Sequence, residues 1–167
     1  MKTLKTIAKT FFIAGILVLL NSCSKDSTTN NVPVSPNNSF VKGKVDGASY
    51  SSLVASCSRL GSGTAAAITI LGGDATGNSI TLLMVGIAAP GTYTVNNVSD
   101  SVLNYSPASG GVAYSTGECS ASSGTITVTA VDATHIQGTF SFVGKDTGNC
   151  DTGATKTITE GSFKGIY

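Results

Sequence analysis

The stretch Gly124–Phe142, GTITVTAVDATHIQGTFSF, decides the fold of this chain. Apolar residues alternate with threonines as far as Ala130, and a second alternation of apolar and polar residues begins at Ile136. A period of two is typical of a strand that buries one face. Two such runs on either side of Asp132–Thr134 predict a β-hairpin whose apolar residues share one face.

The same apolar residues predict the register of this hairpin. Both rows lie on one face only when the numbers of opposed residues sum to an even number, which requires a loop of odd length. We therefore expect Ile126 opposite Phe140 and Val128 opposite Gly138, with the loop at Asp132–Thr134. A two-residue turn would place one row in solvent.

Further short strands are predicted on both sides of the hairpin. Asp46-Gly47 favours a tight turn between Phe40–Val45 and a returning strand, Tyr50–Cys57. Gly161 shifts the alternation of the last segment and indicates a β-bulge. The other expected strands are Ala65–Leu71, Ser79–Val85, Thr92–Val95, Val102–Tyr105, Gly110–Thr116 and Thr155–Tyr167. Together they predict an all-β fold, an antiparallel meander sandwich or flattened barrel of about nine to eleven short strands.

The charge of the chain argues against nucleic acid as a partner. The sequence has ten Lys and Arg against nine Asp and Glu, and no basic cluster follows the first ten residues. Nucleic-acid binding requires such a cluster. Removal of a leader that contains Lys2, Lys5 and Lys9 leaves seven basic and nine acidic residues, so the mature protein is mildly acidic.

Residues 1–22 are expected to form a lipoprotein signal peptide. The three lysines precede an apolar run, Phe11–Leu20, which is too short to span a bilayer. Leu20-Asn21-Ser22-Cys23 resembles a bacterial lipobox, in which the cysteine becomes the N-terminus and carries fatty acyl chains such as palmitate. Several acyl chains on Cys23 would hold the protein on a membrane. A plain secretory signal and a short anchor helix are the alternatives.

A disordered tether, residues 23–38, is expected between the lipid and a single all-β domain, residues 39–167. Ser27–Asn38 is polar and contains two prolines. By analogy with envelope sorting, Ser24 favours the outer membrane, and Ser24-Lys25-Asp26 resembles the surface-export signals of Bacteroidetes lipoproteins. We expect a cell-envelope, outer-membrane lipoprotein, with surface exposure favoured over the periplasmic leaflet.

The residues that most often carry catalysis are few and scattered. His135 is the only histidine, and Glu118 and Glu160 are the only glutamates. A lone histidine does not form a multi-histidine metal site, and nothing pairs the two glutamates as glycosidase carboxylates. Asp146–Asp151 is rich in oxygen ligands but lacks calcium-loop spacing, so a polar turn is the better interpretation. We expect no enzyme activity, no metal and no cofactor.

Four tyrosines and three polar loops are the candidates for ligand contact. Tyrosine combines a ring face with a hydrogen-bonding tip, so the tyrosines suit a sugar or an apolar ligand, although core packing is the commoner role. They are Tyr50, Tyr93, Tyr105 and Tyr114. The loops, Gly72–Asn78, Asn96–Ser101 and Ser106–Gly111, are rich in Gly and Asn.

The cysteines after the leader predict one disulfide. Export exposes them to an oxidising compartment, and the hairpin brings Cys119 and Cys150 to the same end, since position 119 would face roughly position 147. We expect these two to pair. Cys57 is then the odd thiol, which we expect to be a small buried strand residue.

Several short motifs resemble an uncharacterised Bacteroidetes all-β lipoprotein family that is defined only as a domain of unknown function. The resemblance covers about residues 45–167. It rests on Val45-Asp46-Gly47 with Tyr50, Gly91-Thr92-Tyr93, Gly124-Thr125-Ile126-Thr127, Gly138–Phe142, and Thr159–Gly161 with Phe163. It implies a secreted, lipid-anchored all-β domain without a known activity, and the cysteines at 57, 119 and 150 lie outside its pattern.

Two functional classes follow from these observations. The first is a membrane-anchored, non-catalytic binding module for a small apolar ligand or a glycan. The alternative is a structural or interaction component of the outer-membrane surface. An internal cavity lined by tyrosines and aliphatic residues would favour the first, whereas a filled core with an exposed apolar patch or edge strand would favour the second.

Overall fold

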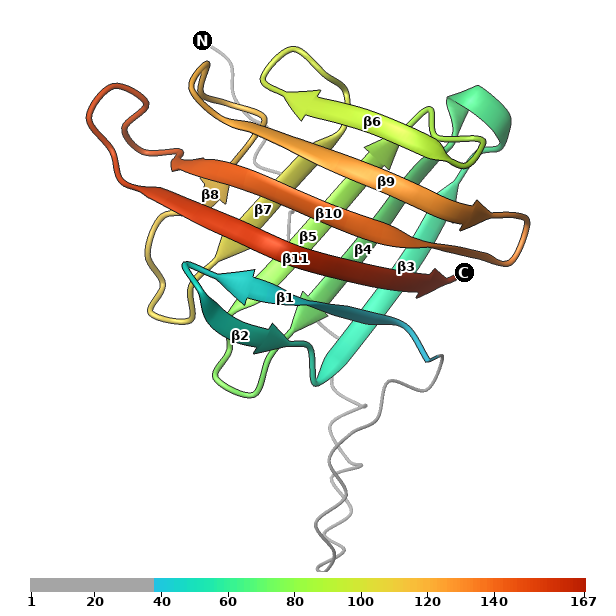
Figure 1. Cartoon of the computed structure of the whole chain (residues 1–167), viewed down its shortest axis with the longest axis horizontal. Helices are drawn as coiled ribbons and strands as arrows, with labels where there is room; N and C mark the ends of the chain where they lie inside the picture. Colours follow the sequence, from blue (N-terminus) through green and yellow to red (C-terminus); the bar gives the residue numbers. More distant parts are fainter. Residues whose placement is uncertain (1–37) are drawn as a thin grey trace, which may run out of the picture. The chain divides into compact units, whose positions relative to one another are not determined.

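The structure, a computed structural model, describes residues 38–167. The predicted signal peptide, Cys23 and the tether lie outside these residues, apart from Asn38. Within them, eleven strands and one short 3-10 helix, η1, follow one another (Figure 1). The elements are β1 (Phe40–Val45), β2 (Ala48–Ser51), β3 (Val54–Leu60), η1 (Gly63–Ala65), β4 (Ala67–Gly73), β5 (Ser79–Val85), β6 (Gly91–Asn96), β7 (Val102–Ser106), β8 (Tyr114–Ser115), β9 (Ser123–Val131), β10 (His135–Asp146) and β11 (Thr155–Ile166). The predicted all-β class is confirmed.

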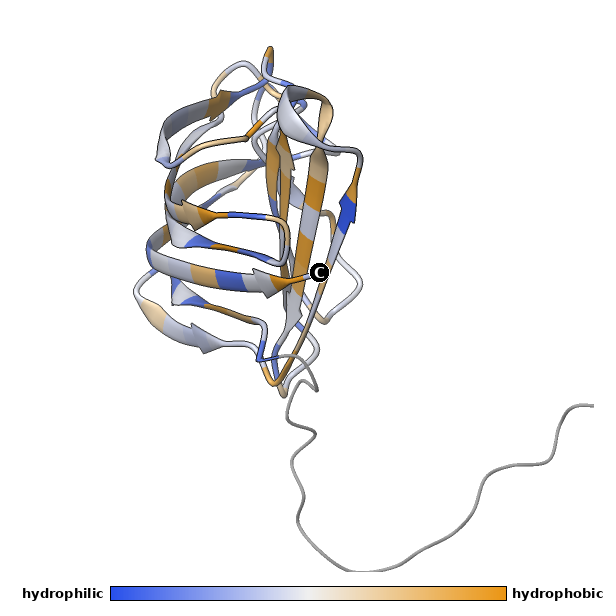
Figure 2. Cartoon of the chain, turned by 90° about the vertical axis from the view of Figure 1, so that its right-hand side faces the viewer, coloured by the Kyte–Doolittle hydropathy of each residue, from blue (hydrophilic) through white to orange (hydrophobic). Residues whose placement is uncertain are grey.

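All strand pairs are antiparallel and belong to one sheet that curls into a half-barrel. The main strand order is β2-β1-β11-β10-β8-β7-β5-β4-β3, and β9 pairs with both β10 and β6. Because the sheet folds over itself, β1, β11, β10, β9 and β6 form one layer in front of β7, β5, β4 and β3 (Figure 1). The edge view shows the two layers, with apolar residues on strands of both (Figure 2), and buried residues from both layers form one cluster.

The connection order departs from a simple meander. β1 pairs with β11, so the two ends of the folded unit lie side by side. β5 pairs with β7 rather than β6, which instead joins β9. The returning strand expected over Tyr50–Cys57 is divided at Ser52-Leu53, where the chain passes from one layer to the other. There the Ser52 amide donates to Val41, and the Leu53 amide donates to Gly73.

The hairpin of β9 and β10 has the predicted register at its centre. Ile126 lies opposite Phe140 and Val128 opposite Gly138. β9 ends at Val131 and β10 begins at His135, so the loop lies at Asp132–Thr134 as expected. The register at this end differs, because Val131 pairs with Ile136 and four residues connect them. A bulge between Val128 and Ala130 supplies the extra residue and restores the even register. As a consequence Ala130 leaves the apolar row, and Val131 packs against the core in its place.

The predicted bulge near Gly161 is also present. Phe140 pairs with Gly161 and Phe142 with Ile158, so β11 has one extra residue at this point. Glu160 occupies the left-handed region, with φ 51°. Gly161 has no space for a side chain, since a Cβ there would lie 2.7 Å from the ring of Phe140.

Side chains fill the space between the layers. Within residues 38–167 the core is one cluster of eighteen buried residues, drawn from both layers. The largest of those with less than 2% exposure include Phe163, Ile68, Ile70, Met84 and Leu103. The hollows described below open to the surface.

Candidate binding groove

A groove of about 340 Å³ lies at one end of the folded unit, where residues from both layers meet. We call it the tyrosine groove. Its residues come from the end of β1, the β1–β2 turn, β2, the β4–β5 turn, β7 and β11. They are Val45, Asp46, Ala48, Ser49, Tyr50, Asp74, Asn78, Tyr105 and Lys156. The groove therefore depends on pairings between distant parts of the chain.

An ion pair forms one wall of the tyrosine groove. Lys156 Nζ lies 2.7 Å from Asp46 Oδ2, and the Thr157 amide donates to Asp46 Oδ1 at 2.9 Å. The hydrogen bond from Lys156, followed by that from Thr157, lowers the pKa of Asp46, and the same contact raises the pKa of Lys156. Asp46 and Gly47 both have positive φ, as the predicted Asp-Gly turn requires. The turn thus fixes the carboxylate that orients the lysine.

The opposite wall is the turn before β5. Asp74 Oδ1 accepts hydrogen bonds from the amides of Thr76 and Asn78 at 2.8 and 2.9 Å. Burial raises the pKa of Asp74, but the hydrogen bonds from Asn78 and Thr76 outweigh it and lower the pKa. Asn78 Oδ1 also accepts from the Ala108 amide at 3.0 Å. This contact ties the turn to the loop after β7.

Three of the four candidate tyrosines gather at this end, mostly as packed residues. Tyr50 is 5% exposed and donates its hydroxyl to the Gly72 carbonyl, and Tyr105 is 7% exposed. Burial raises the pKa of both hydroxyls. The Tyr105 and Tyr114 rings lie 6.2 Å apart, and Lys156 Nζ lies 5.9 Å from the Tyr114 ring centroid. Tyr93 lies elsewhere and donates to Ala89 at 2.7 Å.

Tyr105 brings a polar group to the tyrosine groove, although only 7% of the residue is exposed. Within residues 38–167 its hydroxyl forms no hydrogen bond, although the residue lines the groove. Ser49, which is exposed, contributes a second hydroxyl. Together with the ammonium of Lys156, these groups can donate to and accept from a hydrated ligand.

Two of the three candidate loops lie at the tyrosine groove. The turn within Gly72–Asn78 lines it, and the loop Ser106–Gly111 contacts that turn. Asn96–Ser101 lies at the other end of β5, because Ser101 Oγ accepts from the Val85 amide at 3.0 Å. A ligand in the groove would not contact this third loop.

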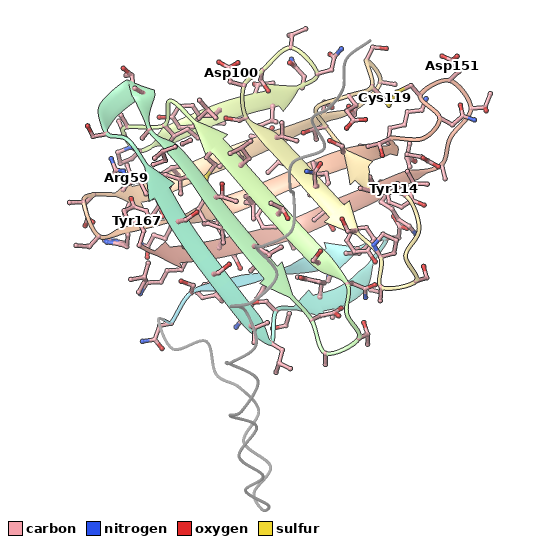
Figure 3. All side chains as sticks on the ribbon, turned by 180° about the vertical axis from the view of Figure 1, so that it is seen from behind. Arg59, Asp100, Tyr114, Cys119, Asp151 and Tyr167 are labelled. Atoms are coloured by element: carbon pink, nitrogen blue, oxygen red, sulfur yellow. A yellow bond between two sulfur atoms is a disulfide. The ribbon has the colours of Figure 1, made fainter. Side chains whose placement is uncertain are left out.

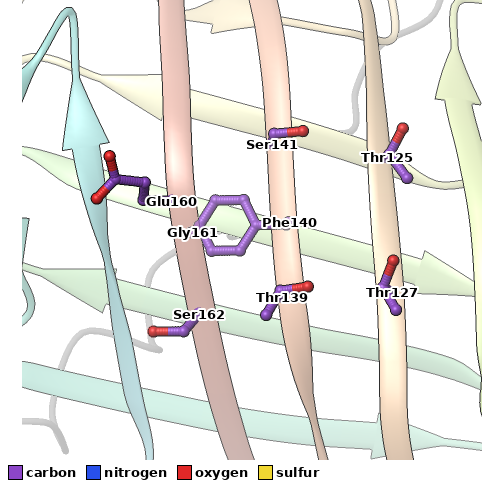
Figure 4. Close-up of a pocket in the computed structure, with 8 residues that line it drawn as sticks. All are labelled: Thr125, Thr127, Thr139, Phe140, Ser141, Glu160, Gly161 and Ser162. Atoms are coloured by element: carbon purple, nitrogen blue, oxygen red, sulfur yellow. The ribbon is translucent and has the colours of Figure 1, made fainter.

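The ionisable residues considered for catalysis lie on separate elements. His135 Nδ1 lies 2.9 Å from Asp132 Oδ2 beside the hairpin loop. Glu118 is exposed between β8 and β9. Glu160 pairs with Lys44 at 2.8 Å and borders a shallow hollow of about 320 Å³ on the outer face, lined by serine and threonine hydroxyls (Figure 4).

The Asp146–Asp151 segment forms a polar loop. Asp146 Oδ1 accepts from the Gly148 amide at 2.8 Å, and Lys145 Nζ donates to the Asp151 carbonyl at 3.3 Å. Among residues 38–167 no group of three His, Cys, Asp or Glu side chains is placed to hold a metal ion. The same residues contain no helix that is long and apolar enough to cross a membrane.

A disulfide joins Cys119 to Cys150, the pairing expected from the sequence. It links the segment before β9 to the loop after β10, and Figure 3 shows Cys119 beside the loop that contains Asp151. Cys57 is a free, half-buried thiol on β3, and burial raises its pKa to about 11. A Cβ at Gly165 would lie 2.4 Å from Cys57 Sγ, so the end of β11 packs directly on this thiol.

These features define a curled all-β domain with a polar groove at one end. The chain belongs to the family described as Domain of unknown function (DUF6252), whose model matches residues 37–166. The predicted membership of an uncharacterised domain family is thereby confirmed. Neither the curated proteins nor the solved structures include a match.

Sequence reasoning missed Lys156, Asp46 and Ser49 as groove residues. Nothing in the local sequence marks them, because β11 and the β1–β2 turn meet only through a long-range strand pairing. The Asp46-Gly47 dipeptide predicts the turn, but it does not predict the ion pair between Asp46 and Lys156.

Proposed function

We propose that this protein is a non-catalytic binding module for a glycan and that the tyrosine groove is its binding site. The observation that carries the proposal is the unpaired hydroxyl of Tyr105 beside the Lys156–Asp46 ion pair. Sugars present many hydroxyl groups, which such fixed donors and acceptors recognise. The half-buried ring of Tyr114 under Lys156 adds an aromatic surface next to the groove.

The filled core supports a glycan over a small apolar ligand. A wholly apolar ligand would be best enclosed between the layers, where eighteen buried side chains of the described unit pack together. The tyrosine groove is open and has charged residues on two walls. Its chemistry suits a ligand that remains partly hydrated.

The proposal includes the location of the protein. The lipobox-like sequence before Cys23 supports a lipid-anchored protein of the cell envelope, on the outer membrane, in a bacterium of the Bacteroidetes. The polar segment up to Asn38 would hold the groove away from the lipid. Replacing Cys23 with Ala is expected to move the protein from the membrane fraction to the soluble fraction. Retention of the unlipidated variant on membranes would contradict the anchor.

Binding is tested with residues 38–167 and a panel of envelope and host glycans. We expect at least one glycan to bind, and Tyr105→Phe to weaken its affinity about five- to tenfold, since one hydrogen bond is worth about 1 kcal/mol. Lys156→Ala is expected to weaken the affinity more than Tyr105→Phe does. Tyr93→Phe is the matched control, because Tyr93 lies outside the groove and its substitution should leave the affinity unchanged. A panel without a ligand, or a ligand insensitive to Tyr105 and Lys156, would contradict the proposal.

We propose that no catalysis accompanies binding. His135, Glu118 and Glu160 lie outside the residues that line the tyrosine groove. General hydrolase assays on the purified unit test this point. Turnover of a bound glycan would contradict it, and the triple variant of these three residues would show whether they contribute.

A second candidate function is an interaction component of the outer-membrane surface. β3 ends the strand order of the sheet, and its side chains Val54 and Leu60 are 47% and 78% exposed. The neighbouring Leu71 on β4 is 44% exposed. Edge strands with apolar side chains are prone to associate with other chains. Concentration-dependent association that Leu60→Lys abolishes would favour this function.

A further inference from the structure

A second groove lies at the opposite end of β5 from the tyrosine groove. We call it the arginine groove; its volume is about 380 Å³. Arg59 pairs with Ile68 of β4, which in turn pairs with Met84 near the end of β5. The Asp74 turn of the tyrosine groove instead precedes the start of β5. Figure 3 accordingly shows Arg59 and Tyr167 on one side of the molecule and Tyr114 on the other.

Contacts on two sides hold the guanidinium of Arg59 in place. Nη1 donates to the Asp132 carbonyl at 2.6 Å and to the Tyr167 hydroxyl at 3.2 Å. The guanidinium carbon lies 5.2 Å from the centroid of the Tyr167 ring. The Tyr167 hydroxyl itself donates to the Asp132 carbonyl at 2.9 Å. The side chain is therefore oriented before any ligand arrives.

This oriented cation has no carboxylate partner in the described part of the chain. The ion pairs there join Lys44 to Glu160 and Lys156 to Asp46, and the His135 ring contacts Asp132. Asp132 accepts from Arg59 through its backbone carbonyl, but its carboxylate contacts other groups. Its Oδ1 accepts from the amides of Thr134 and His135, and its Oδ2 faces His135 Nδ1.

Donors remain on Arg59 for a ligand. A guanidinium has five N–H groups. The side-chain hydrogen bonds of Arg59 to residues 38–167 all use Nη1, so Nε and Nη2 retain their N–H donors. Their fork geometry matches the two oxygens of a carboxylate.

Asp132 also lines the arginine groove, and the remaining walls are formed by small side chains. Ala88, Val131 and Ala133 contribute methyl groups, and Gly61 and Ser62 complete the rim. A ligand with many hydroxyl groups would leave them unpaired against these methyl groups. A short hydrocarbon body would instead be partly removed from water.

We propose that the arginine groove binds a carboxylate that carries a small apolar body. A free branched short-chain acid has this chemistry, and so does the C-terminus of a peptide that ends in valine. Arg59 holds the carboxylate through Nε and Nη2, and the methyl groups of Ala88, Val131 and Ala133 contact the body. The arginine groove shares no residue with the tyrosine groove, so this proposal does not depend on glycan binding.

The test is an NMR titration of the full chain in detergent with 3-methylbutanoate at pH 7. We expect saturable shifts at Gly61, Ser62 and the Arg59 Nε–H signal, with a dissociation constant on the order of a few millimolar for so small a ligand. The neutral 3-methylbutanamide tests the charge and is expected to bind at least tenfold more weakly. Acetyl-Ala-Val as a second ligand distinguishes the peptide source from the free acid.

Arg59→Gln is expected to weaken binding at least tenfold, and Arg59→Lys is expected to recover only part of it. Lys42→Gln removes an exposed cation from the other layer and should have no effect. Circular dichroism checks that each variant folds. Equal binding by Arg59→Gln, or equal binding of the amide and the acid, would overturn the proposal. Inorganic phosphate or glucuronate binding as tightly as 3-methylbutanoate would overturn the assignment to an apolar carboxylate.

Discussion

Gly138→Ala is expected to be among the most damaging single-methyl changes in this protein. A Cβ at Gly138 would lie 2.1 Å from the Thr127 carbonyl oxygen and 3.0 Å from its carbon. Both are backbone atoms of β9, so no side-chain rotation relieves the contact, and β9 and β10 must separate. Overpacking alone costs about 1–3 kcal/mol, and each ladder hydrogen bond lost adds about 1 kcal/mol. We expect the free energy of unfolding to fall by about 3 kcal/mol or more.

The assay is urea unfolding of residues 38–167, followed by circular dichroism. Gly73→Ala is the matched control, because its Cβ would lie 3.7 Å from Val54 Cγ2, an ordinary contact. It should leave the stability unchanged or raise it by up to about 1 kcal/mol through the unfolded state. A Gly138→Ala variant within about 1 kcal/mol of the wild type would refute the hairpin register.

Three further predictions concern the cysteines and Asp132. Replacing Cys119 and Cys150 with Ser should lower the free energy of unfolding by about 3.5–4 kcal/mol, from the chain-entropy model for a separation of 31 residues; a loss under about 1 kcal/mol would argue against the bridge. At pH 8 Cys57, with a pKa of about 11, should react with a thiol reagent about 100-fold more slowly in the native than in the unfolded protein; equal rates would contradict its burial. Hydrogen bonds from Thr134 and the His135 amide lower the pKa of Asp132 to about 2, so its stabilising contribution should be complete above pH about 3.9 and disappear as the pH falls toward 2; a carboxyl NMR titration near 3.9 would disprove this.

The sequence predicts the hairpin well because one buried face imposes a strict period of two. Ile126 and Phe140 could be paired on that ground alone, and the pairing holds. The bulge next to Ala130 was not predicted, since the run of threonines and small apolar residues fits either register locally. The pairing of β1 with β11 was also beyond reach, because it joins residues more than a hundred positions apart and has no local signal.

The candidate site was predictable only in part. Tyr50, Tyr105 and Tyr114 were named as a group, and the structure brings them to one end. The near-complete burial of Tyr50 was not predicted. A tyrosine that packs in the core and one that contacts a ligand occupy the same positions in the alternating pattern of a strand. Arg59 lies beyond the strand expected over Tyr50–Cys57, yet it belongs to β3 and contacts Tyr167, directly after β11.

The central claim is that the tyrosine groove binds a glycan, and NMR mapping of the bound state tests it most directly. With isotope-labelled residues 38–167 and the tightest glycan of the panel, we expect the largest amide shifts at Ser49, Asn78, Tyr105 and Lys156. Signals of Asn96–Ser101, at the other end of β5, should remain unchanged. Shifts centred on Asn96–Ser101, on the outer-face hydroxyls near Glu160, or on no single surface would contradict the claim.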